Sequence, residues 1–114
     1  MVKTRNGRLK KKGVVYRIPC QHRNKVYIGE TERTSQKRIA EHKIAVRRGD
    51  RNNGVAVHAW DTQHEVDWEK VEVITEERHY WRRRVLEAIH IRRSDNTNLD
   101  CGMTLDSVWH PFIE

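Results

Sequence analysis

This chain of 114 residues has little of what usually stabilises small secreted or membrane domains. It has only two cysteines, too few for a disulfide framework. It has no apolar run near the roughly 20 residues of a membrane span, and no signal-peptide pattern. Hydrophobic residues make up only 36%, but four Trp and three Tyr favour an ordered core over disorder. We therefore expect one small domain in a reducing, intracellular compartment, without a membrane partner.

Acidic residues are missing from the first twelve positions, which hold six lysines and arginines. The net charge is +7, so the rest of the chain is close to neutral. We expect residues 1–12 to form a flexible basic arm and residues 13–114 to form the domain. The arm is either a solvated linker or a functional segment, which would bind phosphate or direct nuclear import. The candidate contacts to nucleic acid, in the arm and beyond it, are Lys10, Lys11, Lys12, Arg33, Lys37, Arg47, Arg48 and Arg83.

Two short β-prone segments each carry a tyrosine. The first spans Val14 to Ile18 and the second Lys25 to Ile28, and their tyrosines lie eleven positions apart. The connector between them is short enough for a hairpin, which would place Tyr16 and Tyr27 on neighbouring strands. The alternation of apolar and charged residues from Trp68 to Ile74 predicts a third strand.

Helical patterns fill most of the remaining chain. Thr34 or Ser35 is a candidate N-cap for a helix that reaches Arg48 and ends at Gly49. A short helix is expected from Val55 to Trp60, and a second long helix from His79 to Arg93. Glu87 stands in an apolar context on that last helix, where a carboxylate is costly to bury without a partner.

The order of these segments resembles the GIY-YIG family of endonucleases. Val14-Val15-Tyr16 stands for the first half-motif of that family and Tyr27-Ile28-Gly29 for the second. Downstream come Arg38 and His42, spaced as Arg-x-x-x-His, then Glu87 and Asn98. The resemblance covers residues 13 to about 109. It implies a small α/β (α+β) domain with a three-stranded, mostly antiparallel sheet flanked by helices, and it implies cleavage of nucleic acid.

The resemblance also implies a role for each matching residue. Tyr16 would be the general base and Tyr27 would support it, whereas each could instead pack its ring in a core. Arg38 would bind phosphate oxygens, and His42 would either position Tyr16 or accept its proton. Glu87 would hold a catalytic Mg²⁺ or Mn²⁺, whereas a surface glutamate would instead pair with a nearby arginine. Asn98 would help to hold the phosphate or would be a turn residue.

A second group of residues has the chemistry of a zinc site. Cys20, His22, His58 and His64 could bind a structural Zn²⁺, or they could be scattered side chains. The cysteine and the later histidines resemble the GIY-YIG module of Penelope-like retroelements. That module has a second cysteine where this chain has His22.

These features predict a metal-dependent DNA endonuclease, which would nick DNA. The resemblance implies that the nick primes reverse transcription and integration of a mobile element, with a reverse transcriptase as a fused or separate partner. A nuclear location would follow, or another intracellular location wherever the target DNA is. The alternatives are a zinc-stabilised module that binds nucleic acid without cutting it, and an enzyme that cuts RNA.

Overall fold

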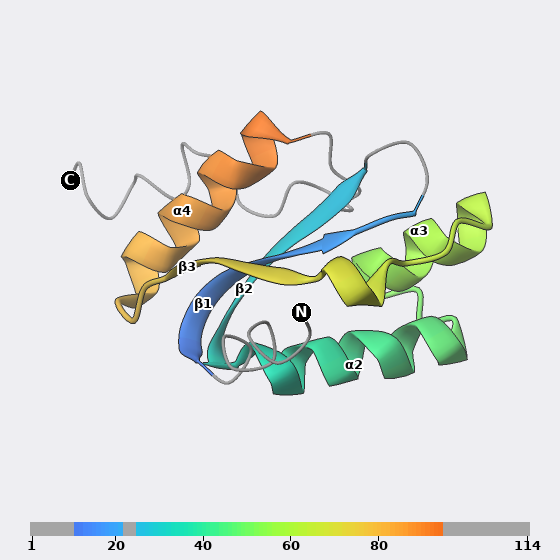
Figure 1. The fold of residues 1–114 in the computed structure, drawn as a ribbon, viewed down its shortest axis with the longest axis horizontal. Coiled ribbons are helices and arrows are strands. Elements are labelled where there is room, and N and C mark those ends of the chain that lie inside the picture. The colour runs from blue at the N-terminus through green and yellow to red at the C-terminus, as the bar shows by residue number, and fades with distance from the viewer. Residues whose placement is uncertain (1–10, 22–24, 95–114) are drawn as a thin grey trace.

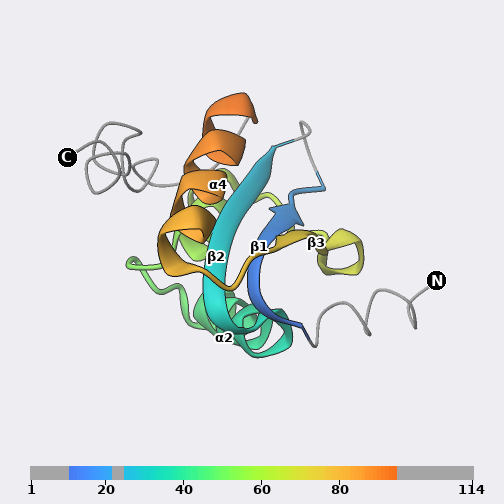
Figure 2. The ribbon, with the colours of Figure 1, turned by 90° about the vertical axis from the view of Figure 1, so that its left-hand side faces the viewer.

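The computed structural model describes residues 11–21 and 25–94, and within these ranges the chain is an α+β domain. Its elements are β1 (Lys12–Pro19), β2 (Val26–Thr34), α2 (Ser35–Arg48), α3 (Gly54–Thr62), a 3₁₀ turn (Trp68–Lys70), β3 (Glu72–Glu76) and α4 (Tyr80–Arg93). The three strands form an antiparallel sheet in the order β2-β1-β3 (Figure 2). The predicted fold class is therefore confirmed.

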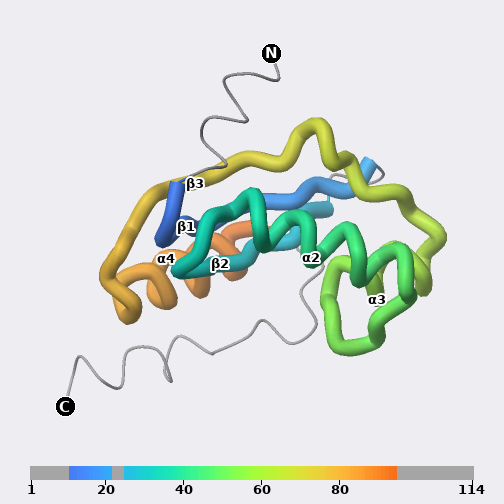
Figure 3. The backbone as a smooth tube through the Cα atoms, turned by 90° about the horizontal axis from the view of Figure 1, so that it is seen from below, coloured from blue at the N-terminus to red at the C-terminus, as the bar shows by residue number. Residues whose placement is uncertain are grey.

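Helices cover the sheet on both sides. In Figure 1, α4 and α2 lie on opposite sides of the strands, and Figure 3 shows the same arrangement from below. On the α2 side, Tyr16 packs with residues that include Ile39 of α2 and Val55 of α3. On the α4 side, Val15 and Ile28 pack against Ile91. The central strand β1 is apolar on both faces because it is covered on both faces.

The register of the hairpin places the two tyrosines on adjacent strands, two residue pairs apart. Tyr16 pairs with Gly29, and Ile18 pairs with Tyr27. Residues two apart on a strand point to the same face. Tyr16 and Tyr27 therefore both face α2, as the interactions of each ring with His42 of α2 confirm.

Local signals explain where the helices begin and end. The Thr34 side chain accepts a hydrogen bond from the Lys37 N–H, and α2 ends at Gly49 in the left-handed conformation, as predicted. Asn53 caps α3 by accepting from the N–H groups of Val55 and Ala56. Because β2 ends at Thr34 and α2 starts at Ser35, Arg38 and His42 are fixed relative to the two tyrosines.

The third strand begins later than the sequence suggests. Trp68 to Lys70 form the 3₁₀ turn, in which the Lys70 N–H donates to the Asp67 carbonyl, and β3 starts at Glu72. Trp68 packs against the core on the α2 side, and the Lys43 ammonium lies 5.6 Å from the centre of its ring. The packing of the half-buried Trp68 against the core thus takes precedence over the alternating pattern.

The first strand begins earlier than expected, at Lys12, which was assigned to the arm. Lys12 pairs with Thr34, so it belongs to the sheet. Residues 1–10, His22 and Asn98 lie outside the described residues. None of the described helices is long and apolar enough to cross a membrane.

Candidate active site

Tyr16 is the centre of a polar group buried between the sheet and α2. Only 1% of the residue is exposed. Its hydroxyl lies 2.8 Å from Nε2 of His42, and it also accepts a hydrogen bond from the guanidinium of Arg38. Burial raises the pKa of Tyr16 above its usual range, and Tyr27 raises it further, whereas Arg38 acts in the opposite direction. Tyr16 is therefore the neutral phenol in the protein without bound ligands.

Gly29 lies directly opposite Tyr16 and leaves room for the phenol. A Cβ atom at this position would lie 2.5 Å from Cζ of Tyr16 and closer still to the hydroxyl oxygen. Atoms that are not bonded to each other do not come this close, so any side chain here would displace the phenol or the strand. The glycine of the second half-motif is thus required for the position of the tyrosine of the first.

Gly29→Ala is expected to destabilise the domain by about 1–3 kcal/mol, the usual range for overpacking, and to lower cleavage by moving Tyr16. Urea unfolding of Gly29→Ala, Tyr16→Phe and the double variant measures the coupling. The cost of Gly29→Ala should be smaller in the Tyr16→Phe background, since phenylalanine lacks the overlapping oxygen. An equal cost in both backgrounds would mean that the strain lies elsewhere.

Arg38 is held over Tyr16 by Glu41. The Arg38 Nη1 lies 2.9 Å from Oε1 of Glu41, three residues later on α2. The Glu41 carboxylate also accepts hydrogen bonds from Nη1 and Nη2 of Arg33, at 2.7 and 2.8 Å. The Arg38 side chain is 31% exposed, so it can contact both the buried phenol and a ligand from solvent. A phosphate would meet a fixed guanidinium here.

His42 is fully buried and neutral at physiological pH. Burial, followed by the charge of Arg38, lowers the pKa of His42 to about 4, although a hydrogen bond with Asn53 and the charge of Glu41 act in the opposite direction. The ring contacts both tyrosines at 5.8 and 5.2 Å between ring centres. Its Nδ1 lies 2.9 Å from Nδ2 and 3.2 Å from Oδ1 of Asn53. His42 thus links the N-cap of α3 to Tyr16.

The lowered pKa of His42 predicts acid instability. Between pH 6.5 and about 4 the unfolded chain binds a proton at this histidine and the folded chain does not, so stability falls as the pH falls. The loss attributable to His42 is expected to reach about 3 kcal/mol. Urea unfolding of wild type and His42→Gln at pH 7 and pH 4 tests this. Equal pH dependence in the two proteins would contradict the prediction.

Glu87 contacts β2 from the side of the sheet that α4 covers, opposite to the side on which Tyr16 lies. It lies on α4, and the backbone N–H of Glu30 on β2 donates to its carboxylate. That N–H belongs to the Gly29–Glu30 peptide, whose glycine contacts the Tyr16 phenol. This peptide therefore joins the carboxylate to the phenol, and the charge of Glu87 contributes to the raised pKa of Tyr16.

The surroundings of Glu87 fit a hard divalent cation. Burial, followed by the charge of Glu30, raises the pKa of Glu87 to about 7, although Arg84 and Arg83 lower it. The Arg84 Nε is 3.7 Å from Oε1 of Glu87, and the Glu87 side chain is 17% exposed. Two neighbouring carboxylates with little water favour an added positive charge, and oxygen donors are those that Mg²⁺ and Mn²⁺ prefer. A surface pairing with arginine alone does not describe this glutamate.

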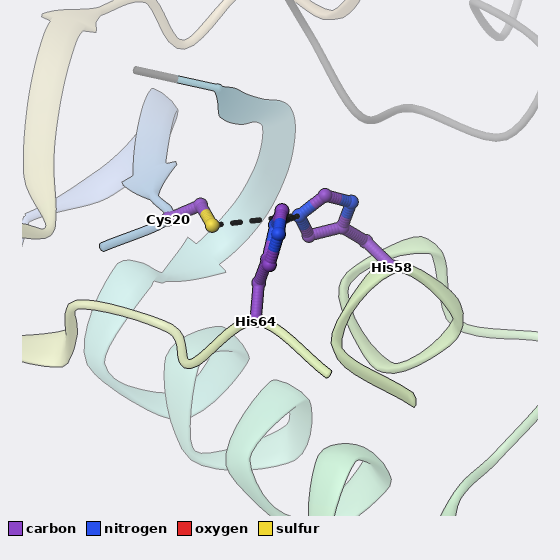
Figure 4. Close-up of side chains that lie close together, drawn as sticks. All are labelled: Cys20, His58 and His64. Atoms are coloured by element: carbon purple, nitrogen blue, oxygen red, sulfur yellow. Dashed lines mark hydrogen bonds between the residues drawn. The ribbon is translucent and has the colours of Figure 1, made fainter. Parts of the chain in front are cut away.

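Three of the four predicted zinc ligands lie together at the end of β1. Cys20 Sγ is 3.4 Å from His58 Nε2, which is 3.3 Å from His64 Nδ1. Figure 4 shows the three side chains pointing toward one another from the residue after β1, from α3 and from the segment after α3. Donors around a tetrahedral zinc, with metal–ligand distances of about 2.0–2.3 Å, are about 3.3–3.6 Å apart. The two distances match this spacing, and all three donor atoms lie within 4.8 Å of one another, so the cluster could hold a metal ion.

Burial, His64 and Lys25 lower the pKa of His58, which keeps it in the neutral form that binds metal. The fourth predicted ligand, His22, lies outside the described residues.

The predicted nucleic-acid contacts fall into three groups. Lys11, Lys12, Lys37, Arg47 and Arg48 are exposed, the last three on α2, and Lys10 lies outside the described residues. Arg33 is exposed but its guanidinium is bound by Glu41. Arg83 does not fit its predicted role: its side chain is 3% exposed, and its Nε lies 2.5 Å from Oε1 of Glu30. Its position on the inward side of α4, opposite Glu30, explains this burial.

Sequence reasoning missed Asn53, Glu41 and Glu30. Asn53 had a signal, since an asparagine before a helix is a preferred N-cap, but nothing indicated its contact with His42. Glu41 and Glu30 look like ordinary surface acids in the sequence. Their importance comes from arginines that are three to 53 residues away in the chain.

The described residues thus gather two tyrosines, an arginine and a glutamate around the hairpin of β1 and β2. The family model of the GIY-YIG catalytic domain matches residues 12–98, which is most of the chain. The chain therefore belongs to the GIY-YIG family, whose members are endonucleases that generally depend on a divalent metal. A search of curated proteins and a search of solved structures found no match to the chain.

Proposed function

We propose that this chain is a metal-dependent endonuclease that nicks DNA. The observation that supports this most is the Tyr16 hydroxyl, which meets His42 at 2.8 Å, accepts from Arg38 and is electrostatically coupled to Tyr27 and Glu87. A core tyrosine needs none of these partners. A tyrosine that becomes an anion during the reaction needs hydrogen-bond donors and a nearby positive charge.

The proposed reaction adds water across a phosphodiester bond. The water oxygen bonds to phosphorus, the bond between phosphorus and the 3′ oxygen breaks, and that oxygen takes up a proton. Tyr16 first releases its own proton to solvent, and its ionised oxygen then accepts one proton of the attacking water, while the leaving 3′ oxygen takes its proton from solvent. Arg38 donates to the phosphate oxygens, where negative charge increases, and its planar guanidinium suits this role. Tyr27 packs against His42 and helps to keep the group in place.

A divalent cation held by Glu87 would supply charge stabilisation at the phosphate and at the leaving oxygen. In the chain itself, Glu30 and the N–H of the Gly29–Glu30 peptide orient the Glu87 carboxylate. The negative charge of Glu87 raises the pKa of Tyr16, so neutralising that charge favours ionisation of Tyr16. The cation site and the base are thus expected to be coupled. Asn98 is proposed to assist phosphate binding.

A structural zinc ion at Cys20, His58 and His64, with His22 as the fourth ligand, is proposed to fasten β1 to α3. Zinc binding is then part of the folding free energy. A strong chelator should lower the melting temperature. His58→Ala and His64→Ala should do the same without chelator, whereas His90→Ala, on α4, should not remove the chelator effect. Protein that contains well under one zinc per chain and melts unchanged with chelator would contradict the site.

We further propose the setting of a Penelope-like retroelement. In that setting the nick supplies the 3′ end that primes reverse transcription by a partner reverse transcriptase, and the target DNA places the protein in the nucleus. The Cys20–His58–His64 cluster supports this, because it brings together one cysteine and two histidines that resemble those of that group, although His22 stands where the group has a second cysteine. Target-primed synthesis on a nicked plasmid, with a reverse transcriptase joined to this chain, tests the role.

The direct test of cleavage uses supercoiled plasmid. Nicked circles should form with Mg²⁺ or Mn²⁺ and not when both are omitted. Omission is preferable to a chelator, which would also remove zinc. A chain that binds plasmid but leaves it supercoiled with either metal would favour the alternative, a zinc-stabilised binding module. Cleavage of single-stranded RNA but not of plasmid would favour an RNA-cutting enzyme.

A further inference from the structure

Glu41 joins two arginines into one group beside Tyr16. Its carboxylate accepts from Nη1 and Nη2 of Arg33 at 2.7 and 2.8 Å, and from Nη1 of Arg38 at 2.9 Å. Arg33 comes from β2, whereas Arg38 and Glu41 lie one turn apart on α2. The Arg38 guanidinium also forms a hydrogen bond with the Tyr16 hydroxyl. A continuous chain of contacts therefore runs from β2 through Glu41 and Arg38 to the phenol.

The contact between Arg33 and Glu41 has the geometry that makes an exposed ion pair effective. Most surface ion pairs contribute little, but pairs with two parallel hydrogen bonds and pairs within a network are exceptions. This pair has both properties. The hydrogen bonds of Arg33 lower the pKa of Glu41 to about 2, with help from Arg38 and against the effect of burial. Glu41 is therefore an anion throughout the neutral pH range.

The two arginines differ in what they can still bind. Arg33 turns both terminal nitrogens toward Glu41, so its planar face for a phosphate is already occupied. Arg38 uses one terminal nitrogen for Glu41, and its side chain is 31% exposed. A guanidinium has five N–H donors, of which Glu41 and Tyr16 take only some. Arg38 is thus the arginine of this group that has donors for a phosphate.

We propose that Glu41 is a positioning residue for Arg38, and that Arg33 acts through Glu41 and not by contacting DNA. This inference rests on the proposed nuclease function and deepens it. A mobile arginine loses conformational entropy when a phosphate orders it. A guanidinium that Glu41 already holds has lost that freedom beforehand, so its charge is in place where negative charge increases during the reaction.

Arg33→Lys separates positioning from a contact with DNA. Lysine keeps the positive charge, so a phosphate contact should survive, but lysine lacks the planar fork that binds both Glu41 oxygens. With Mg²⁺, kcat for plasmid nicking should fall about 3-fold, the scale of one well-formed exposed pair. Affinity for plasmid, measured without divalent metal, should stay unchanged. A loss of affinity with an unchanged kcat would mean that Arg33 contacts DNA, and would overturn the proposal.

Glu41→Gln removes the anion that binds both arginines and keeps the size of the side chain. Its kcat should fall about 10-fold, the usual effect of losing one charge-assisted hydrogen bond, while DNA affinity stays equal or rises because a negative charge is lost. In an Arg38→Lys background the same change should have little effect, because the guanidinium that Glu41 positions is absent. Nicking by Glu41→Gln at the wild-type rate or faster would overturn the proposal.

Asp61→Asn is the matched control. Asp61 on α3 accepts from Nη1 and Nη2 of Arg51 at 2.8 and 3.1 Å, so it forms the same kind of exposed two-bond pair. Neither residue of this pair has a described contact with Arg38 or Tyr16. Asp61→Asn should therefore keep the wild-type kcat. An equal loss of kcat in Asp61→Asn and Glu41→Gln would mean that any such surface pair supports the fold, and would overturn a specific role for Glu41.

Side-chain order at Arg38 tests the positioning without any cleavage. ¹⁵N relaxation of labelled arginine measures the order of the Nε–H bond. Arg38 should be rigid in wild type and in Asp61→Asn, and mobile in Glu41→Gln. A mobile Arg38 in wild type, or one that stays equally rigid in Glu41→Gln, would overturn the proposal. If Arg38 loosens in Glu41→Gln but the wild type cuts no DNA, the proposed function fails and the assignment of Glu41 as the residue that holds Arg38 is still supported.

Discussion

Tyr16→Phe is expected to slow plasmid nicking by about 10²-fold or more while the domain stays folded, because a positioned general base contributes about 10²- to 10⁴-fold. The change removes one oxygen atom and keeps the ring that fills the core between β1 and α2. It leaves Nε2 of His42 and one N–H of Arg38 without their hydrogen-bond partner. The loss should therefore appear in kcat, with a modest cost in stability of about 1–3 kcal/mol from the unpaired polar groups.

Tyr80→Phe is the matched control for this variant. Tyr80 is 45% exposed at the start of α4, and its hydroxyl accepts from Arg84 on the surface. Removing that hydroxyl should leave nicking unchanged. If Tyr16→Phe cuts plasmid at the wild-type rate, the phenol is a core residue and another group is the base.

The sheet and the helix ends could be predicted from the sequence because their signals are local. The β-prone segments around Tyr16 and Tyr27, the cap at Thr34 and the stop at Gly49 each depend on neighbouring residues. The third strand was misplaced for the same reason. Its alternating pattern is local, but the packing of the half-buried Trp68 against the core is not.

The site could be predicted only as a set of separate residues. Motif order identified Tyr16, Arg38, His42 and Glu87, but it did not indicate that burial outweighs Arg38 and raises the pKa of Tyr16. Nor could it place Arg83, which looks like a surface cation within a run of three arginines. Its burial depends on Glu30, 53 residues earlier in the chain. Contacts of this kind follow from the packing of α4 on β2, which no short pattern encodes.

The structure separates basic side chains that are held by acidic residues from those that are exposed and suited to contact DNA. Arg33, Arg38, Arg83 and Arg84 lie near Glu30, Glu41 or Glu87, so these acids hold several basic side chains in place. Within residues 11–21 and 25–94, the exposed cations Lys37, Arg47 and Arg48 of α2 have no such pairing. α2 therefore carries both Arg38 and the positive face best suited to a DNA backbone.

Glu87→Gln is expected to abolish nicking, with a loss of about 10³-fold or more, because a cation at the phosphate contributes several kcal/mol to the transition state. Glutamine keeps the size of the side chain and can still accept from the Glu30 N–H. The substitution removes the negative charge of residue 87, which the nearby negative charge of Glu30 disfavours. Unlike loss of a structural residue, this change should leave the melting temperature equal or higher at pH 8, where wild-type Glu87 is ionised.

Three measurements separate the role of Glu87 from a general effect of charge. Glu69→Gln, on the exposed 3₁₀ turn, removes the same charge far from the phenol in sequence and should nick normally. DNA binding by Glu87→Gln, measured by mobility shift without divalent metal, should be equal or tighter, since one negative charge near the phosphate is gone. Raising Mn²⁺ should not restore nicking, because the anionic ligand itself is missing. If Glu87→Gln nicks at the wild-type rate, Glu87 does not bind the catalytic metal. The raised pKa of its carboxylate would then follow only from burial beside Glu30.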